Sequence, residues 1–257
     1  MHMQDLVILT GASRGLGLAM ARELIAPGQP LLCLSRRANP ELARLGQARN
    51  ATVLQWTVDL ADPAPVAARL QQWLSGIDAP TLASATLINN AGVIPEIAPL
   101  EHCPPAGISQ ALRVGLEAPM LLTAAFLNAS GAWVDAGWRG PRKVLNISSG
   151  LGRRAMASQA PYCAAKAGMD HFSRCVALDE ARREHGARIV SLAPGVIDTD
   201  MQMQLRAGDP ERFPDRQRFV ELQRQHQLST PEQAAAQVLA WLRRPDFGRE
   251  PAADVRG

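Results

Sequence analysis

The sequence predicts one α/β domain in which a doubly wound parallel sheet carries helices on both faces. Short apolar runs alternate with helical patterns along all 257 residues, the arrangement that produces parallel strands. A strand, a glycine-rich turn and a helix follow one another at the start of the chain, and no repeat or low-complexity linker divides it. We therefore expect residues 1–257 to form a single domain.

Composition limits the class of protein. Hydrophobic residues make up 47% of the chain and charged residues 20%, as in ordinary soluble globular proteins. The net charge is only +3 and no long basic run occurs, so we expect no nucleic-acid partner. No apolar run approaches the roughly 20 residues that span a bilayer, and the N-terminus lacks a signal-peptide pattern. The four cysteines have neither metal-ligand spacing nor the density of a disulfide framework. A cytoplasmic protein with reduced thiols, no metal site and no membrane partner is expected.

The first unit carries the clearest binding signal. The apolar run at 6–9 is typical of a strand buried on both faces, and a helical pattern occupies 18–25. Between them, residues 10–17 read Thr-Gly-Ala-Ser-Arg-Gly-Leu-Gly. Glycines in this context let the backbone turn tightly and approach a pyrophosphate, whose charge the helix N-terminus favours. The unit predicts dinucleotide binding, with a purely structural turn as the alternative.

The end of the second strand, predicted over 31–34, bears on the choice of cofactor. Arg36 and Arg37 follow it, and no acidic residue does. An acidic residue there would bond the adenosine ribose hydroxyls, whereas an arginine suits the additional phosphate of NADP. Arg14, in the glycine-rich turn, could reach the same phosphate. We therefore expect NADP(H) in preference to NAD(H); the alternative is that the two arginines form a solvated helix entry.

The alternation continues after this point. A helix is expected at 40–46 and a strand at 53–58. The strand ends in Asp59, which could accept a hydrogen bond from an adenine amino group or could simply cap the turn. Asp62 and Pro63 are typical of the start of the next helix.

Polar residues end the fourth strand, which we expect at 86–88. Asn89, Asn90, Ala91 and Gly92 follow it directly, and the carboxyl ends of parallel strands are where ligands bind. Beyond them the sequence predicts three further segments: a long helix at about 107–129, a loop at 128–142 and a fifth strand at 144–147.

Tyr162 and Lys166 form the strongest catalytic candidate. Tyr162 is the only tyrosine of the chain, and Lys143 and Lys166 are its only lysines. A spacing of four residues places the two side chains on one face of a helix, one turn apart. A cation beside a phenol favours the phenolate, so the spacing predicts a lowered pKa for Tyr162. A packed aromatic beside an unrelated lysine is the structural alternative.

The last third of the chain contains a long polar excursion. The helix opened by Tyr162 is rich in small residues at 164–168, and close approach of a second subunit is one use for them. A strand is expected at 189–193. Residues 200–227 are polar without a clean period, which is typical of a functional flap. Thr230, followed by proline, marks the start of a final helix.

Taken together, these motifs resemble the short-chain dehydrogenase/reductase family over nearly the whole chain. The glycine-rich turn at 10–17, Asp59, residues 89–92, the Tyr162/Lys166 pair and the Pro-Gly at 194–195 carry the resemblance, together with Ser149. The family implies a single Rossmann-type domain with a parallel sheet of about seven strands. It also implies hydride transfer between a nicotinamide cofactor and a carbonyl or alcohol.

The resemblance assigns roles to individual residues. Ser149, thirteen positions before Tyr162, would be the catalytic serine and hydrogen-bond the reacting oxygen. Tyr162 would act as general acid, and Lys166 with the oxidised nicotinamide would lower the pKa of the phenol. Thr199 would lie near the carboxamide. The residues implied to line the cofactor are Gly11, Ser13, Arg14, Leu16, Gly17, Arg36, Asp59, Leu60, Asn90, Ala91, Gly92, Tyr162, Lys166, Pro194, Gly195, Ile197 and Thr199.

Two positions depart from the family pattern. Gly115 occupies the place of an asparagine whose main-chain carbonyl binds a water in the proton relay to the lysine; we expect the relay to survive, because glycine keeps the carbonyl. The C-terminus at 250–257 lacks the usual glycine-rich closing strand. The segment from Phe213 to that terminus looks more like sepiapterin reductases and benzil-type diketone reductases.

The expected function is NADPH-dependent reduction of a small ketone or dicarbonyl to an alcohol. The alternatives are an NAD(P)-dependent alcohol dehydrogenase working in the oxidative direction and a catalytically idle NADP-binding sensor or scaffold. An idle protein could lose Ser149, Tyr162 or Lys166 without penalty, and this chain has all three. The family further implies a homodimer or homotetramer. Nothing in the composition of 200–227 names the substrate.

Overall fold

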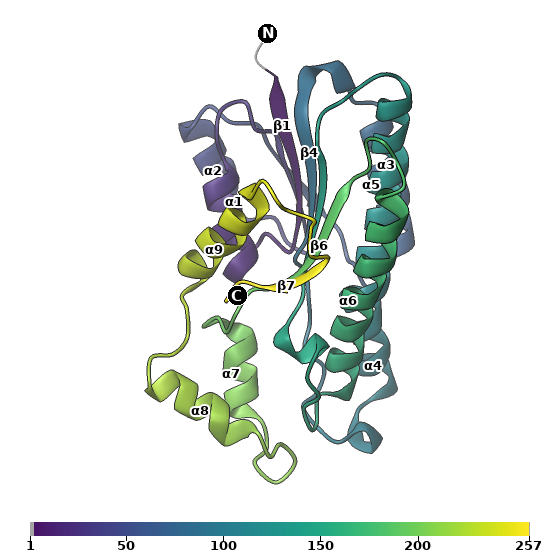
Figure 1. The fold of residues 1–257 in the computed structure, drawn as a ribbon. Helices are drawn as coiled ribbons and strands as arrows, with labels where there is room; N and C mark the ends of the chain where they lie inside the picture. Colours follow the sequence, from purple (N-terminus) through teal and green to yellow (C-terminus); the bar gives the residue numbers. More distant parts are fainter. Residues whose placement is uncertain (1–2, 257) are drawn as a thin grey trace.

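The computed structural model describes residues 3–256 and contains one parallel sheet with helices on both faces (Figure 1). The strands lie in the order β3-β2-β1-β4-β5-β6-β7, and every neighbouring pair is parallel. This confirms the predicted single, doubly wound Rossmann-type domain. The strands are β1 (Gln4–Thr10), β2 (Leu31–Ser35), β3 (Val53–Thr57), β4 (Leu82–Asn89), β5 (Arg142–Ile147), β6 (Arg188–Ala193) and β7 (Ala252–Asp254).

Alternate residues of β1 supply the two halves of the core, as expected for a strand buried on both faces. Leu6 and Ile8 pack among the residues of one apolar cluster, whereas Val7 and Leu9 belong to the other. Helices α1, α2 and α9 cover the second cluster, and α3 and α5 cover the first (Figure 1). The helices are α1 (Gly15–Leu24), α2 (Pro40–Ala48), α3 (Pro63–Ser75), α4 (Pro105–Leu112), α5 (Ala118–Asp135), α6 (Ala160–Glu180), α7 (Asp200–Ala207), α8 (Arg216–Arg224) and α9 (Pro231–Arg243).

The strand order reverses between β1 and β4, which are hydrogen-bonded neighbours at the centre of the sheet. Chain connections leave these two strands in opposite directions, so a crevice opens at their carboxyl ends. The turn that follows β1 and the polar residues that follow β4 therefore meet at one edge of the sheet. This topology determines where the candidate site lies.

The predicted long helix at 107–129 is interrupted, and the predicted loop at 128–142 is mostly helical. A π-helical segment, Arg113–Glu117, separates α4 from α5, and the Ala118 N–H donates to the Arg113 carbonyl. Helix α5 continues to Asp135 because Ala129 and Trp133 are buried against the core beside α3. Packing of one helical face outweighs Gly131, one of the glycines and prolines that suggested a loop.

The C-terminus also differs from the expectation. A closing strand is present, because β7 pairs with β6 through Ala252, Ala253 and Asp254. It contains no glycine; Ala253 is buried in the core and provides the apolar contact that attaches this short strand to the sheet.

Residues 200–227 fold as two helices, α7 and α8, joined by a short connection below the carboxyl edge of the sheet (Figure 1). Leu205, Phe213 and Phe219 are buried together, and Ile94 and Met156 from elsewhere in the chain pack against them. The Phe213 and Phe219 rings stack with centroids 5.7 Å apart. The polar excursion is therefore a folded unit with a small core of its own.

Composition led to expectations about cysteines, metal sites and membrane-spanning helices, and the structure of residues 3–256 bears on each of them. Cys33, Cys103, Cys163 and Cys175 are all free thiols. Within this described part, no group of histidine, cysteine and carboxylate side chains could hold a metal ion. No helix of the same residues combines the length and the apolar character required to cross a membrane.

Candidate active site

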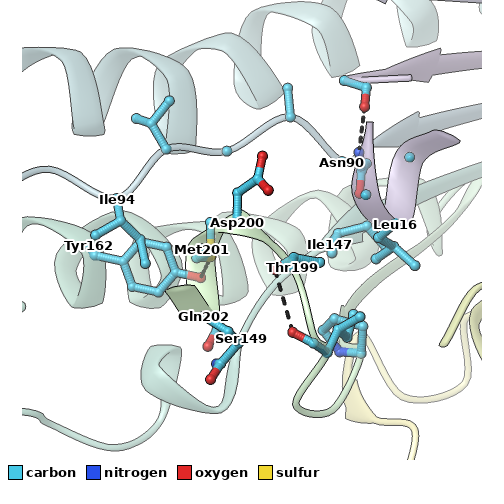
Figure 2. A pocket seen from close by; sticks show the side chains of 18 of the residues that line it. Leu16, Asn90, Ile94, Ile147, Ser149, Tyr162, Thr199, Asp200, Met201 and Gln202 are labelled. Carbon is cyan, nitrogen blue, oxygen red and sulfur yellow. Dashed lines mark hydrogen bonds between the residues drawn. The ribbon is translucent and has the colours of Figure 1, made fainter. Parts of the chain in front are cut away.

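One cleft of about 1090 Å³ lies at the carboxyl ends of β1 and β4. The structure brings together there every residue that the sequence predicts for the site. The cleft is lined by Gly11, Ser13, Arg14, Leu16, Gly17, Arg36, Asp59, Leu60, Asn90, Ala91, Gly92, Ser149, Tyr162, Lys166, Pro194, Gly195, Ile197 and Thr199. Figure 2 shows part of this lining, with Asn90 and Leu16 at one end and Tyr162 and Ile94 at the other.

Two glycines make the turn after β1 possible. Gly11 has φ +71°, and a Cβ on it would lie 2.9 Å from Ala91 Cα. A Cβ on Gly17 would lie 2.1 Å from the Gly11 carbonyl oxygen, closer than atoms can approach. A side chain at either position would therefore push the start of α1 away from the end of β4.

Hydrogen bonds fasten this turn to the end of β4. The Thr10 hydroxyl accepts from the backbone N–H groups of Asn90 (2.9 Å) and Ala91 (3.0 Å). In return, the Asn90 side chain donates to the Thr10 carbonyl at 3.0 Å. The two loops that border the crevice thus form one rigid edge.

The first turn of α1 fits the phosphates of a dinucleotide. Arg14 is the N-cap residue, its side chain makes no capping bond, and the first turn contains no acidic residue. The N–H groups at this end therefore remain available to an anion, and the helix dipole favours negative charge there. Together with the space kept free by Gly11 and Gly17, this is a suitable cradle for a pyrophosphate.

The charged residues of the cleft near the glycine-rich turn and the end of β2 fall into two groups. Arg36 and Arg37 are exposed, and among residues 3–256 neither forms an ion pair. Arg14, in contrast, is already paired with Asp200 at the start of α7, at 2.5 Å. The Asp59 carboxylate accepts from the Ala61 N–H at 2.9 Å, so it caps its turn and also faces the cleft.

Tyr162 and Lys166 lie on one face of α6, as their spacing predicts, with Lys166 Nζ 5.9 Å from the centre of the phenol ring. The expected lowering of the phenol pKa is wrong for the protein alone. Burial raises the pKa of Tyr162 to about 12, and Ser149 offsets only part of that increase. The reason is that Lys166 donates to the Ile147 carbonyl at 2.7 Å, while the phenol hydroxyl points toward the Met201 sulfur, 3.9 Å away (Figure 2). Tyr162 is therefore a protonated donor.

Lys166 is buried, and desolvation lowers its pKa to about 8 even though the charge of Asp170 acts in the opposite direction. Asp170 follows Lys166 by one helical turn and accepts from the Ser148 and Ser191 hydroxyls at 2.6 Å each. Arg153 Nε donates to its other oxygen at 2.9 Å. The sequence analysis missed this buried carboxylate, although its position four residues after Lys166 places it on the same helix face.

The Ser149 hydroxyl oxygen accepts from the Leu151 N–H at 3.2 Å, which caps a short turn after β5. A serine hydroxyl that accepts in this way keeps its own hydrogen free to donate. Ser149 can therefore hydrogen-bond an oxygen in the cleft while its position is set by the backbone.

Gly115 lies in the π-helical segment and lets that segment pack closely against α6. A Cβ at Gly115 would lie 3.0 Å from Ala165 Cβ, next to Lys166. Gly168 meets Leu116 of the same segment in a similar way. Part of the small-residue face of α6 is therefore used inside this chain. π-helical turns within helices are frequent at functional sites.

The second wall of the cleft comes from segments that no motif identified. Met201 and Gln202 stand in the first turn of α7, and Gln159 precedes Tyr162 by three residues. The apolar side chains of this wall come from Ile94, Val114, Met156, Leu205, Phe219 and Leu222, and Gln110, Arg154 and Arg218 also line the cleft. Only the fold brings these residues together, because α7 and α8 are far from residues 94 and 156 in the chain.

Comparison with known proteins gives consistent matches. The chain matches the short chain dehydrogenase family over residues 5–210. A benzil reductase, (S)-benzoin forming, of Bacillus cereus is 35% identical over 242 residues, which cover 94% of this chain and 95% of the relative. A sepiapterin reductase of Xenopus laevis is 32% identical over 217 residues, covering 80% of this chain and 79% of the relative. The predicted likeness to these two groups of reductases is confirmed.

Solved structures share the fold. A short-chain dehydrogenase/reductase from Burkholderia vietnamiensis is 32% identical with a TM-score of 0.64, and the match covers 100% of this chain and 99% of that one. A 3-oxoacyl-[acyl-carrier protein] reductase from Brucella melitensis, in complex with NAD, has a TM-score of 0.79 at 23% identity. That match covers 99% of this chain and 96% of the other, and at this identity it bears on the fold alone.

Proposed function

The chain belongs to the short-chain dehydrogenase/reductase family, and on that premise we propose that it uses NADPH to reduce the carbonyl group of a small ketone or dicarbonyl to an alcohol. The observation that carries the proposal is that Ser149, Tyr162 and Lys166 share one cleft with the glycine-rich turn. A catalytically idle sensor or scaffold would have no use for that arrangement.

Each of the three residues has a distinct task in the proposed reaction. Tyr162 donates its proton to the carbonyl oxygen, for which a phenol that stays protonated at neutral pH is suited. The Ser149 hydroxyl donates a hydrogen bond to the same oxygen as negative charge develops on it. Lys166 holds the nicotinamide ribose and keeps positive charge near the phenol. When bound, the cofactor supplies the hydride and, once oxidised, a positive charge that lowers the pKa of Tyr162.

The shape of the cleft supports an assignment of the cofactor contacts. The pyrophosphate is assigned to the turn at Gly11 and Gly17, and the nicotinamide end to Asn90, Thr199 and Lys166. Arg36 is exposed at the end of β2 where no acidic residue competes, and this supports NADP(H) over NAD(H). Because cells hold NADPH mainly for reductive chemistry, the same arginine supports reduction over alcohol oxidation.

The flap formed by residues 200–227 is assigned to the substrate. Its Leu205 and Phe219 pack with Ile94 and Met156 and form an apolar part of the lining of the cleft. A compact ketone with an apolar body suits such a wall. The likeness to a benzil reductase, whose name states a diketone substrate, supports dicarbonyl compounds among the candidates. Gly115 keeps the main-chain carbonyl at the π-helical segment, so we also propose that the water relay to Lys166 operates.

Two further properties concern the location and the assembly of the protein. A cytoplasmic location is proposed. A homodimer or homotetramer is also proposed, since Ala164 and Ala167 of α6 remain exposed after Ala165 and Gly168 have packed inside the chain. Gel filtration with light scattering measures the assembly directly.

Replacing the phenol tests the mechanism. Tyr162→Phe removes the proposed proton donor and leaves the ring, so we expect the rate of ketone reduction to fall by about 10²- to 10⁴-fold. Nicotinamide fluorescence on titration with NADPH should be nearly unchanged, because the cofactor cradle is intact. A Tyr162→Phe protein that reduces ketones at the parent rate overturns the mechanism, and a clear preference for NADH overturns the role given to Arg36.

A further inference from the structure

Two buried side-chain amides in the cleft lack a donor for their carbonyl oxygens. Gln159 is completely buried and Gln202 is 8% exposed. Among residues 3–256, neither Gln159 Oε1 nor Gln202 Oε1 has a hydrogen-bond partner. Both residues line the cleft that contains Tyr162. Buried acceptors are almost always paired in folded proteins, so two unpaired ones in a single cleft indicate that a ligand supplies the donors.

A hydrogen bond made by the Gln159 side chain identifies which atom of its amide has no partner. Gln159 Nε2 donates to the Ser158 carbonyl at 3.0 Å, so the oxygen is the atom left without a partner. Ser158 itself has φ +61°, and its hydroxyl donates to the Arg212 carbonyl of the flap. The turn that carries Gln159 is therefore attached to the substrate side of the cleft.

Gln202 lies beside the reacting group. Its neighbour Met201 receives the Tyr162 hydroxyl at 3.9 Å, which places the first turn of α7 against the phenol (Figure 2). Leu205 and Phe219 are apolar members of the wall around it, which also includes the exposed Arg218. An amide oxygen in such surroundings discriminates strongly between a donor and an apolar group, because an unpaired polar atom is costly where water is excluded.

We propose that Gln202, together with Gln159, selects carbonyl substrates that carry a hydroxyl or N–H donor on the atom next to the reacting carbonyl carbon. Such compounds are α-hydroxyketones and α-amido ketones. The ketone oxygen faces Tyr162 and Ser149, and the neighbouring donor binds Gln202 Oε1. This inference rests on the proposed function and makes it more specific, since a dicarbonyl without a donor gains nothing from Gln202 Oε1.

A matched pair of substrates tests this selection. 2-Hydroxy-1-phenylethanone carries the donor, and 1-phenylpropan-1-one has a methyl group in its place. With NADPH, Gln202→Met should lower kcat/KM for the hydroxyketone by about tenfold to a hundredfold and leave the methyl ketone within about twofold. Intrinsic differences in reactivity cancel, because the same two ketones are compared in each protein. Gln159→Met should act in the same direction with a smaller loss.

Gln204→Met is the matched control, since Gln204 is exposed on the same helix and does not line the cleft. It should change neither ketone. Equal losses for both ketones in Gln202→Met would mean a purely structural role, and no loss for either would mean that water fills the site; either result overturns the inference.

A binding measurement separates this inference from the proposed function. In the presence of NADP⁺, the hydroxyketone should raise the melting temperature of the parent protein more than the methyl ketone does, and Gln202→Met should abolish the difference. If no ketone is reduced but this difference is found, the proposed function fails and the donor site stands. If ketones are reduced but the two ligands stabilise parent and variant alike, the donor site fails and the reductase stands.

Discussion

The glycine-rich turn at 10–17 and the flap at 200–227 form two walls of one cleft, meet at the Arg14–Asp200 ion pair and owe their structures to different causes. The turn is determined by contacts between main-chain atoms, such as the 2.1 Å that would separate a Cβ at Gly17 from the Gly11 carbonyl. The flap is held by side chains, with Phe213 and Phe219 packed against Ile94 and Met156 from other parts of the chain. Few substitutions are tolerated in the turn, because its backbone atoms leave no room for a side chain. Side chains of the flap can be replaced by others of similar volume without loss of the fold.

This contrast assigns the two walls different tasks. The rigid turn suits a cofactor that is the same for every substrate, and the flap suits the part of the site that distinguishes one ketone from another. Substitutions in the two walls should therefore separate cofactor binding from substrate binding.

The largest effect is expected from Gly17→Ala. The added methyl group cannot be accommodated against the Gly11 carbonyl, so α1 must move away from β4 and the phosphate cradle opens. We expect NADPH affinity to fall more than about a hundredfold, as measured by nicotinamide fluorescence, since a misplaced binding group loses that much. Gly76→Ala is the control, because a Cβ there meets nothing closer than 3.6 Å. Normal affinity in Gly17→Ala would show that the turn is not the cradle.

In the flap, Phe213→Ala should affect the substrate alone. Phe213 is 1% exposed and stacks on Phe219, so its truncation removes about 3 kcal/mol of packing from α7 and α8. We expect KM for the ketone to rise about tenfold, with NADPH affinity unchanged, because only the flap loosens. Parallel losses of both affinities would contradict the separation of the two walls.

The protonation state of Lys166 should set how kcat/KM for ketone reduction depends on pH. Its pKa of about 8 means that it loses its proton as the pH rises through 8, while Tyr162, with a pKa of about 12, stays protonated. The value of kcat/KM for reduction should be level near pH 7 and fall above pH 8, by about tenfold per unit at most. Because the charge of Asp170 raises the pKa of Lys166, Asp170→Asn should move the decline to lower pH. A level profile from pH 7 to 9 would remove Lys166 from this role.

The smallest effect is expected at the outer end of the cofactor wall. Arg36→Ala should lower the preference for NADPH over NADH by about tenfold, the size of one charge-assisted contact to an exposed phosphate. Arg37→Ala serves as the matched comparison, since both arginines are exposed and line the cleft, but only Arg36 follows the last residue of β2 directly. The kcat/KM ratio of the two cofactors is the measurement, and an unchanged ratio would assign the phosphate elsewhere.

Several features could be predicted from local patterns because their causes are local. Alternating apolar residues in β1, the glycines of the following turn, the four-residue spacing of Tyr162 and Lys166, and Thr230 as the cap of α9 are each decided by neighbours in the chain. The predicted cap at Thr230 is confirmed, and the structure adds that Thr230 and Gln233 form a capping box. These patterns predicted the sheet, the cleft and the residues that line its cofactor side.

Tertiary contacts decided what local patterns could not. The pKa of Tyr162 is high because the folded chain buries the phenol, a quantity that spacing from Lys166 does not contain. Helix α5 extends to Asp135 because Trp133 finds a core to pack against, and β7 forms because Ala253 does. The unpaired amide oxygens of Gln159 and Gln202 indicate a ligand site only because the fold brings two segments about forty residues apart to the same cleft. The sequence by itself determined the sheet, the glycine-rich turn and the motifs of the family, because these depend on neighbours in the chain. Burial and long-range packing decided the pKa of Tyr162 and which residues form the second wall of the cleft.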